Sequence, residues 1–213
     1  MLDLDLPSLL TRVFILVTAF SVHEFAHAWV ANAFGDDTPR LNGRLTLNPA
    51  AHLDVMGSLM LLIAGFGWAK PVPVNPYLLR RRSPSALMWV SLAGPLSNLV
   101  MAALAALPLR FSLLPLNQIP GSFLPTPAEF LLEFIFINLL LMLFNLIPLF
   151  PLDGEKVLEY FLPARQAQFL GDIRPYGPLI LFALVFVGPV IGLDIFGLII
   201  RPPLEFLFRL LVG

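Results

Sequence analysis

The stretch that decides the fold is FSVHEFAHAW, residues 20–29, in which two histidines and a glutamate interrupt an otherwise apolar run. The run extends from Leu9 to Phe34, which is long enough for a helix that crosses the roughly 30 Å hydrocarbon core of a bilayer. Ionisable side chains are costly inside a membrane and usually mark a functional site. The stretch therefore predicts a membrane-spanning helix that carries chemistry.

Composition indicates that the whole chain is built for lipid. It is 58% hydrophobic and 13% charged, with a mean hydropathy of +0.84 over 213 residues, which is too apolar for a soluble domain of this size. The net charge of −1 leaves no basic face for nucleic acid, and the absence of cysteine excludes disulfides and thiolate zinc sites. We expect one integral membrane domain, residues 1–213, whose partner is the lipid bilayer.

Further apolar runs give the expected architecture. Clear spans follow at Met88–Leu109 and Phe130–Leu149, and a fourth lies at about Pro178–Ile200. Residues 53–67 hold an apolar core of only about 12 residues, so we expect a re-entrant or interfacial piece, followed by an extended proline-rich segment. The fold class is an all-α polytopic membrane protein: a three-helix core over about 8–160, a short re-entrant β/loop region after the first span, a fourth span over about 178–200, and a C-terminal interfacial helix.

The distribution of Lys and Arg predicts the orientation. If residues 53–67 do not cross the membrane, nine of the thirteen cationic residues lie on one side, and if they do cross, the division is eight to five. The positive-inside rule favours the first arrangement, which places residues 35–87 in the cytosol. We therefore expect a multi-pass cell-membrane protein whose active site opens toward the cytosolic side.

The motif H-E-x-x-H supplies the chemistry. On a helix, His23 and His27 lie one turn apart on the same face, so both imidazoles can bind one zinc ion. Glu24 stands beside the first histidine, where its carboxylate can take a proton from zinc-bound water. The alternative is that these side chains are buried packing groups that hydrogen-bond to neighbouring helices.

A catalytic zinc needs a third protein ligand and an open fourth position. Two candidates remain in this cysteine-free chain. Asp153 lies at the end of the third span, on the same side of the membrane as the histidines in the favoured topology. His52 is the other candidate; its alternative role is a hydrogen bond within a loop, just as Asp54 can serve to stabilise a turn.

Four motifs together resemble a known family. HEFAH in the first span, GFGWAKPVPVNP after it, LAGPLSN in the second span and NLIPLFPLDG in the third are similar to motifs of the site-2 protease family of intramembrane zinc metalloproteases, peptidase family M50. The resemblance implies a three-helix core in which His23, His27 and Asp153 hold one Zn²⁺ and Glu24 is the catalytic acid and base. It also implies substrate contacts from Asn145 and from the β-loop glycines Gly65 and Gly67.

One residue departs from the family pattern. Glu155 stands where many relatives have a second glycine after the aspartate-glycine pair. Outside the motif roles, Gly94 and Pro95 predict close helix packing and a kink, and Asn98 a hydrogen bond across the helix bundle.

The resemblance implies an intramembrane zinc endopeptidase that cleaves transmembrane or membrane-proximal segments of membrane proteins. Two alternatives stay open: a membrane zinc transporter, and a helix-binding pseudoprotease without activity. Glu24 favours the enzyme, because a transporter has no special need for a carboxylate that is not a ligand.

Overall fold

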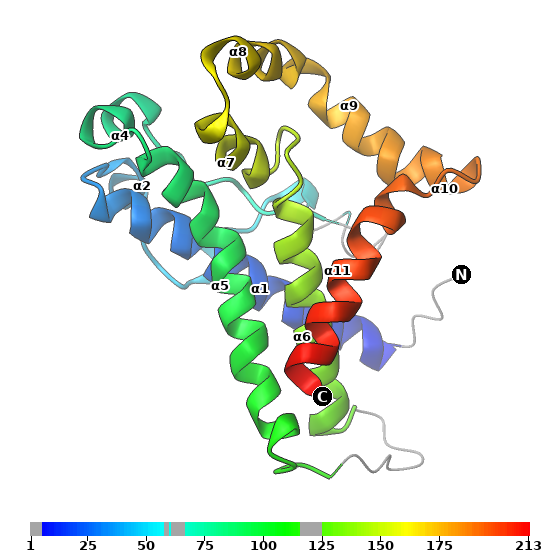
Figure 1. Ribbon diagram of the computed structural model, residues 1–213. Coiled ribbons are helices and arrows are strands. Elements are labelled where there is room, and N and C mark those ends of the chain that lie inside the picture. The colour runs from blue at the N-terminus through cyan, green and yellow to red at the C-terminus, as the bar shows by residue number, and fades with distance from the viewer. Residues whose placement is uncertain (1–5, 58–59, 61–66, 116–124) are drawn as a thin grey trace.

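The computed structural model describes residues 6–57, 60, 67–115 and 125–213, and these form an all-α membrane protein (Figure 1). Four helical segments are long and apolar enough to cross a membrane: α1 (Leu6–Ala33), α5 (Ala86–Arg110), α6 (Pro127–Asn145) and the continuous segment Ala164–Val190. In the described residues the only β-structure is an isolated antiparallel bridge between Leu53 and Ala69. The expected fold class is confirmed.

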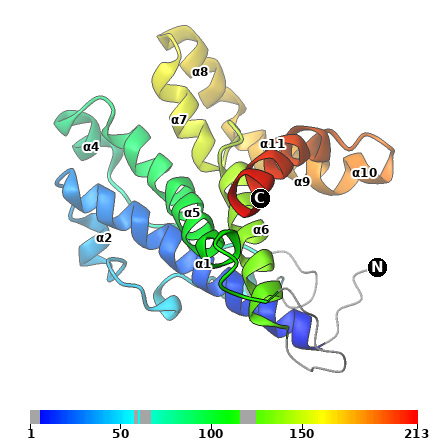
Figure 2. The ribbon, with the colours of Figure 1, turned by 60° about the horizontal axis from the view of Figure 1, so that its bottom comes forward.

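The three-helix core is formed by α1, α5 and α6. Helix α5 packs against both of the others, and the two views agree on this arrangement (Figures 1 and 2). Small side chains let the backbones approach closely, which replaces the hydrophobic effect as the cause of helix association in lipid. The buried small residues include Ala19, Ala28 and Ala31 of α1 and Ala102 and Ala106 of α5.

The ends of these helices follow from local sequence. Thr126 caps α6 in a capping box with Glu129. Helix α6 ends at Asn145, four residues before the expected Leu149, and Pro148 and Pro151 prevent the helix from continuing. The irregular segment 146–152 then leads directly into α7 (Asp153–Phe161).

Short elements connect α1 to α5. Helix α2 (Thr38–Leu41), the 3₁₀ turn η1 (Pro49–Ala51) and α4 (Pro76–Arg82) are separated by extended chain, including residues 67–75 as expected. Most of the predicted re-entrant piece, including Gly65, lies outside the described residues. The last turns of α1 and the first turns of α5 lie side by side, so this connection begins and ends on the same side of the helix pair.

The C-terminal region differs from the expected boundaries. Helix α8 (Ala164–Ile173), η2 (Arg174–Tyr176), α9 (Gly177–Phe182), the π-helical η3 (Ala183–Val187) and α10 (Gly188–Val190) follow one another, so the fourth candidate span begins at Ala164 and not near Pro178. Gly192, at a φ of +79°, turns the chain. Helix α11 (Ile195–Val212) then returns to the core and buries Ile200 and Leu204 against α5 and α6 (Figure 1). The tail is therefore part of a longer helix than expected.

Candidate metal centre

The two histidines of α1 meet near the end of that helix. Their spacing of four residues places the Nε2 atoms of His23 and His27 3.0 Å apart, and both side chains are buried. His27 lies six residues before Ala33, the last residue of α1, or roughly 9 Å along the axis at the rise of an α-helix. The pair is therefore inside the bundle but close to the C-terminal end of α1.

The other nitrogen of each ring is held by α5. His27 Nδ1 donates to the carbonyl oxygen of Val90 over 2.7 Å, and His23 Nδ1 pairs with Oδ1 of Asn98 over 2.6 Å. A carbonyl oxygen can only accept, so Nδ1 of His27 carries the proton and a neutral ring presents a lone pair at Nε2. This is the tautomer that a metal ligand requires.

A chain of amides fixes the same tautomer in His23. Asn138 of α6 donates from Nδ2 to the carbonyl oxygen of Phe134, 2.9 Å away, and its Oδ1 accepts from Nδ2 of Asn98 over 2.9 Å. This series of hydrogen bonds ends on the carbonyl oxygen of Phe134, which can only accept. Asn98 must therefore present its Oδ1 to Nδ1 of His23. Both asparagines are fully buried. Three helices therefore cooperate to orient one imidazole.

Asp153 completes the cluster as the first residue of α7. Its Oδ2 lies 3.2 Å from Nε2 of His23 and 3.3 Å from Nε2 of His27. The irregular segment after α6 brings it there, and Gly154 is needed because a Cβ at this position would collide with the backbone of Leu146. The structure thus brings together the histidines and the aspartate that the sequence named.

The donor atoms fit a zinc ion. Asp153 Oδ2 is buried and makes no hydrogen bond, although it faces the two imidazole lone pairs. Three electron-rich atoms that converge in a buried site form a donor set that a bound cation would satisfy. A tetrahedral zinc with bonds of about 2.0–2.1 Å separates its ligand atoms by about 3.3 Å, close to the distances seen here. Three protein ligands leave the fourth position open, as in catalytic zinc sites.

The rival ligand lies elsewhere. His52 is buried in the loop before residue 53, where Nε2 donates to the carbonyl oxygen of Thr46 over 2.7 Å. The group of residues able to hold a metal within the described chain contains both α1 histidines and Asp153 but not His52. Asp54 accepts from the amide of Gly57 over 2.8 Å, which is the turn-stabilising role expected of it.

Gly94 of α5 lies directly against both imidazoles. A Cβ built on this glycine would come within 2.5 Å of Nε2 of His23 and even closer to Nε2 of His27. The expected close packing at Gly94 is therefore correct, but the partner is the metal-binding pair itself. Pro95, which is buried, follows within the same helix.

Glu24 stands next to the ligands but is not one of them. Its Oε2 accepts from the backbone amide of Val72 over 3.1 Å. Val72 belongs to the extended segment 67–75, which is anchored at Lys70 and Pro71 by the buried Arg44. The carboxylate is therefore held beside the extended segment.

The structure describes two of the three residues that were predicted to contact the substrate. The contacts of these two residues do not test that role. Asn145 donates from Nδ2 to the carbonyl oxygen of Leu141 in its own helix. Gly67 is half-buried at the start of the extended segment. Sequence reasoning missed Asn138, although an amide in the middle of an apolar span was the signal that could have found it.

The fold and the donor set define a membrane-embedded metal centre, and comparison with known proteins gives the family. Residues 124–188 match the model of peptidase family M50. The chain is 42% identical over 183 residues to "Putative zinc metalloprotease YwhC" of Bacillus subtilis (strain 168), covering 84% of this chain and 80% of that protein.

Two further relatives carry the same kind of name. "Putative zinc metalloprotease Rip2" is 30% identical in Mycobacterium tuberculosis (strain ATCC 25618 / H37Rv), over 91% of this chain and 74% of that protein. In Mycolicibacterium smegmatis (strain ATCC 700084 / mc(2)155) it is 34% identical, over 88% of this chain and 72% of that protein. No solved structure matches significantly. The chain belongs to peptidase family M50, and the relatives' names and the donor set both indicate Zn²⁺ as its cofactor.

Proposed function

We propose that this chain is an intramembrane zinc endopeptidase that cleaves peptide bonds in or near the transmembrane segments of other membrane proteins. It acts as one integral membrane domain, with His23, His27 and Asp153 as ligands of one zinc ion and Glu24 as the catalytic acid and base. The observation that carries the proposal is the position of Glu24: a carboxylate beside the ligands, outside the ligand set, and oriented by the amide of Val72.

Each group at the site has its own part in the chemistry. A bound zinc supplies Lewis acidity, which polarises the scissile carbonyl and activates a water molecule. The Nδ1 hydrogen bonds of His23 and His27 keep both Nε2 lone pairs on the ligand side throughout the reaction. Glu24 accepts the proton of the attacking water and gives it to the leaving amine.

The extended segment 67–75 suggests how the substrate is presented. A peptide bond inside a helix is hydrogen-bonded and shielded, so the substrate helix must unwind before it is cut. We propose that the unwound strand pairs with the extended segment by β-augmentation, next to Glu24. Gly67 and Gly65 permit this close approach, and Asn145 at the end of α6 binds the strand.

The metal centre faces the cytosol in this proposal. The support is the excess of Lys and Arg in the segments before α5 and after α6. In this cysteine-free chain, single cysteines report sidedness without background. Arg40→Cys and Arg81→Cys should both react with a membrane-impermeant maleimide only from the cytosolic side, and Leu113→Cys only from outside. The reverse labelling pattern would refute the orientation.

The decisive experiment is Glu24→Gln in purified protein with a single-span substrate. The variant keeps the size and polarity of the side chain, so it should retain about one zinc and still bind substrate. Its cleavage rate should fall by about 10²–10⁴-fold, the effect of losing a general base. Glu205→Gln, an exposed position on α11, is the matched control and should cleave normally.

The same experiment separates the alternatives. Near-normal cleavage by Glu24→Gln would refute the catalytic role of this carboxylate. Zinc flux into proteoliposomes by a wild-type chain that cleaves nothing would identify a transporter. Binding of the substrate with neither flux nor cleavage would identify a pseudoprotease.

A further inference from the structure

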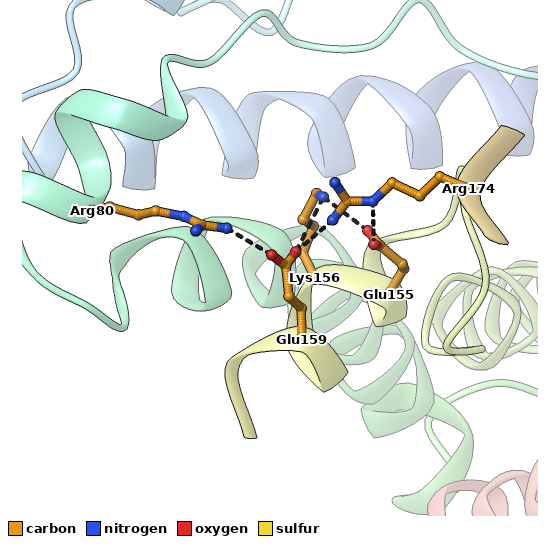
Figure 3. Close-up of polar contacts among 5 residues, drawn as sticks. All are labelled: Arg80, Glu155, Lys156, Glu159 and Arg174. Carbon is orange, nitrogen blue, oxygen red and sulfur yellow. Dashed lines mark hydrogen bonds and ion pairs between the residues drawn. The ribbon is translucent and has the colours of Figure 1, made fainter. Parts of the chain in front are cut away.

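Five charged side chains form a cluster around α7, the helix that begins with Asp153 (Figure 3). They come from three elements that are far apart in the sequence: Arg80 of α4, Arg174 of η2, and Glu155, Lys156 and Glu159 of α7. None of them belongs to the proposed catalytic set. Helix α7 is common to both places, because it begins with Asp153.

Glu155 is the most deeply buried charged side chain of the cluster. Its side chain is only 1% exposed, and it lies two residues after the candidate ligand Asp153. Burying a carboxylate without compensation is expensive. Nε of Arg174 donates to its Oε1 over 2.6 Å, whereas Oε2 lies 3.0 Å from Nζ of Lys156 but makes no hydrogen bond. Arg174 is therefore the main partner of this buried charge.

Arg174 also spans two turns of α7. While Nε holds Glu155, Nη2 of the same guanidinium donates to Oε2 of Glu159 over 2.6 Å. The two glutamates are four residues apart and so lie on one face of the helix. A guanidinium has the planar fork needed to bind both carboxylates, and a lysine ammonium does not.

The cluster also links α7 to α4, which packs against the helix that orients the two histidines. Arg80 donates from Nη2 to Oε1 of Glu159 over 2.7 Å, which ties α7 to α4 (Figure 3). Helix α4 packs against α5, the helix that supplies Val90, Gly94 and Asn98 to the histidines. A series of ion pairs that ends at Arg174 therefore links α7 to the helices around the imidazoles, in addition to the direct packing of α7 against α5.

Helix α7 is also held by direct packing against α5. Leu152, which precedes the helix, makes no side-chain capping hydrogen bond, and Oδ2 of Asp153 makes none either. Gly154 packs closely against the backbone of Leu146, which fixes the first turn of the helix. A metal site tolerates deviations of only about 0.2 Å in ligand distance. A small rotation of α7 is thus enough to weaken the site.

We propose that Arg174 is a positioning residue for Asp153, and that it couples the fourth candidate membrane span, in which it lies, to the metal centre. The inference rests on the proposed function in one respect, the assignment of Asp153 as a ligand. It explains why this chain has Glu155 where many relatives have glycine: the glutamate is the buried anchor for the arginine.

The test compares Arg174→Met, Arg174→Lys and the matched control Arg165→Met in the purified full chain. Arg165 is exposed on α8, and its replacement removes the same charge from the same span. Zinc affinity is measured by competition with a chelator, and the geometry of the site by the visible spectrum of the Co²⁺-substituted protein. Arg174→Met should weaken zinc binding about 10-fold, the lower end of the effect of outer partners of a metal ligand, and should change the Co²⁺ spectrum. Arg174→Lys should recover part of the loss, and Arg165→Met should bind zinc within about twofold of wild type.

A double variant separates positioning from simple destabilisation. Glu155→Gln combined with Arg174→Met removes the buried carboxylate charge along with its main partner, so the double variant should fold even if Arg174→Met does not. Positioning predicts that zinc binding stays weak in the double variant, because the link between η2 and α7 is still broken. Wild-type affinity and an unchanged Co²⁺ spectrum in the double variant would overturn the inference.

The zinc-binding test of Arg174 does not depend on the cleavage assay. If wild-type protein binds zinc through the three ligands but cleaves nothing, the proposed peptidase function fails and the positioning role stands. If Asp153→Ala binds zinc like the wild type, Asp153 is not a ligand and the positioning role falls with it.

Discussion

Gly94→Ala tests the metal centre by the smallest possible change. The added methyl group would lie 2.5 Å from Nε2 and 2.6 Å from Cε1 of His23, where ordinary contacts begin at about 3.4 Å. It would also press on His27 from the same side, so neither ring can move away without the other. Relief of the contact requires the imidazoles or the α5 backbone to shift by nearly 1 Å.

The expected loss of zinc follows from that displacement. Ligand distances in a metal site are held to about 0.2 Å, so a shift several times larger should break the geometry. The Nδ1 hydrogen bonds to Val90 and Asn98 resist the movement, because they hold both rings against α5. We expect zinc affinity to fall by at least about 100-fold, or about 2.8 kcal/mol, and cleavage to be lost with it. Zinc content after dialysis and titration against a chelator measure the effect.

A matched glycine gives the control. Gly171 lies in α8, and a Cβ added to it would have nothing within 4 Å, so Gly171→Ala should bind zinc normally. Alanine favours a helix over glycine by about 1 kcal/mol, so loss of helix propensity cannot explain a defect at position 94. If Gly94→Ala keeps about one zinc per chain at an affinity within threefold of wild type, the packing argument is wrong.

Other predictions test the remaining parts of the site. Alanine at any of the three candidate ligands should remove most of the zinc, whereas His52→Ala should retain it; the opposite result for Asp153 and His52 would show that the third ligand is misassigned. Asn98→Leu should weaken zinc binding about 10–100-fold, because Nδ1 of His23 loses its acceptor, and equal affinity would exclude an orienting role. Burial alone would raise the pKa of Glu159, but the ion pairs to Arg80, Lys156 and Arg174 outweigh it and lower the pKa below its ordinary 4.5. The contribution of Glu159 to stability is therefore present above that pH and lost as the pH falls through the folded-state pKa. The difference in melting temperature between wild type and Glu159→Gln should shrink on acidification, and a difference that is constant from pH 7 to pH 3 would contradict this.

The parts of the site that the sequence predicted are those that local geometry determines. Helical periodicity alone places His23 and His27 on one face, and the need of zinc for a third ligand leaves few choices in a chain without cysteine. The choice between Asp153 and His52 depended on tertiary structure. The irregular chain after α6 brings the aspartate inward, while the loop histidine is satisfied by Thr46.

The parts that were not predicted depend on long-range packing. Asn138 acts through Asn98, forty residues earlier, and nothing in the sequence around it reveals which helix it faces. The start of the fourth candidate span was missed because α8 is polar although it is continuous with the apolar helix after it, and the end was missed because residues 178–200 are almost uninterruptedly apolar. The break is made by the turn at Gly192 and by Asp194, whose side chain accepts from the amide of Gly197 at the start of α11.

The buried side-chain atoms that lack a hydrogen-bond partner differ in their neighbours, and this difference distinguishes a metal site from an ion pair that only stabilises the fold. Among the described residues, four buried side-chain atoms lack a hydrogen-bond partner, on Asn32, His52, Asp153 and Glu155. The atom of Glu155 has an ammonium group 3.0 Å away, which compensates its charge. The atom of Asp153 is different, because its near neighbours are two imidazole nitrogens whose protons are committed to α5. A zinc ion between these three atoms would accept a lone pair from each of them, so the atoms around Asp153 have the character of a metal site, whereas those around Glu155 form an ion pair within the fold.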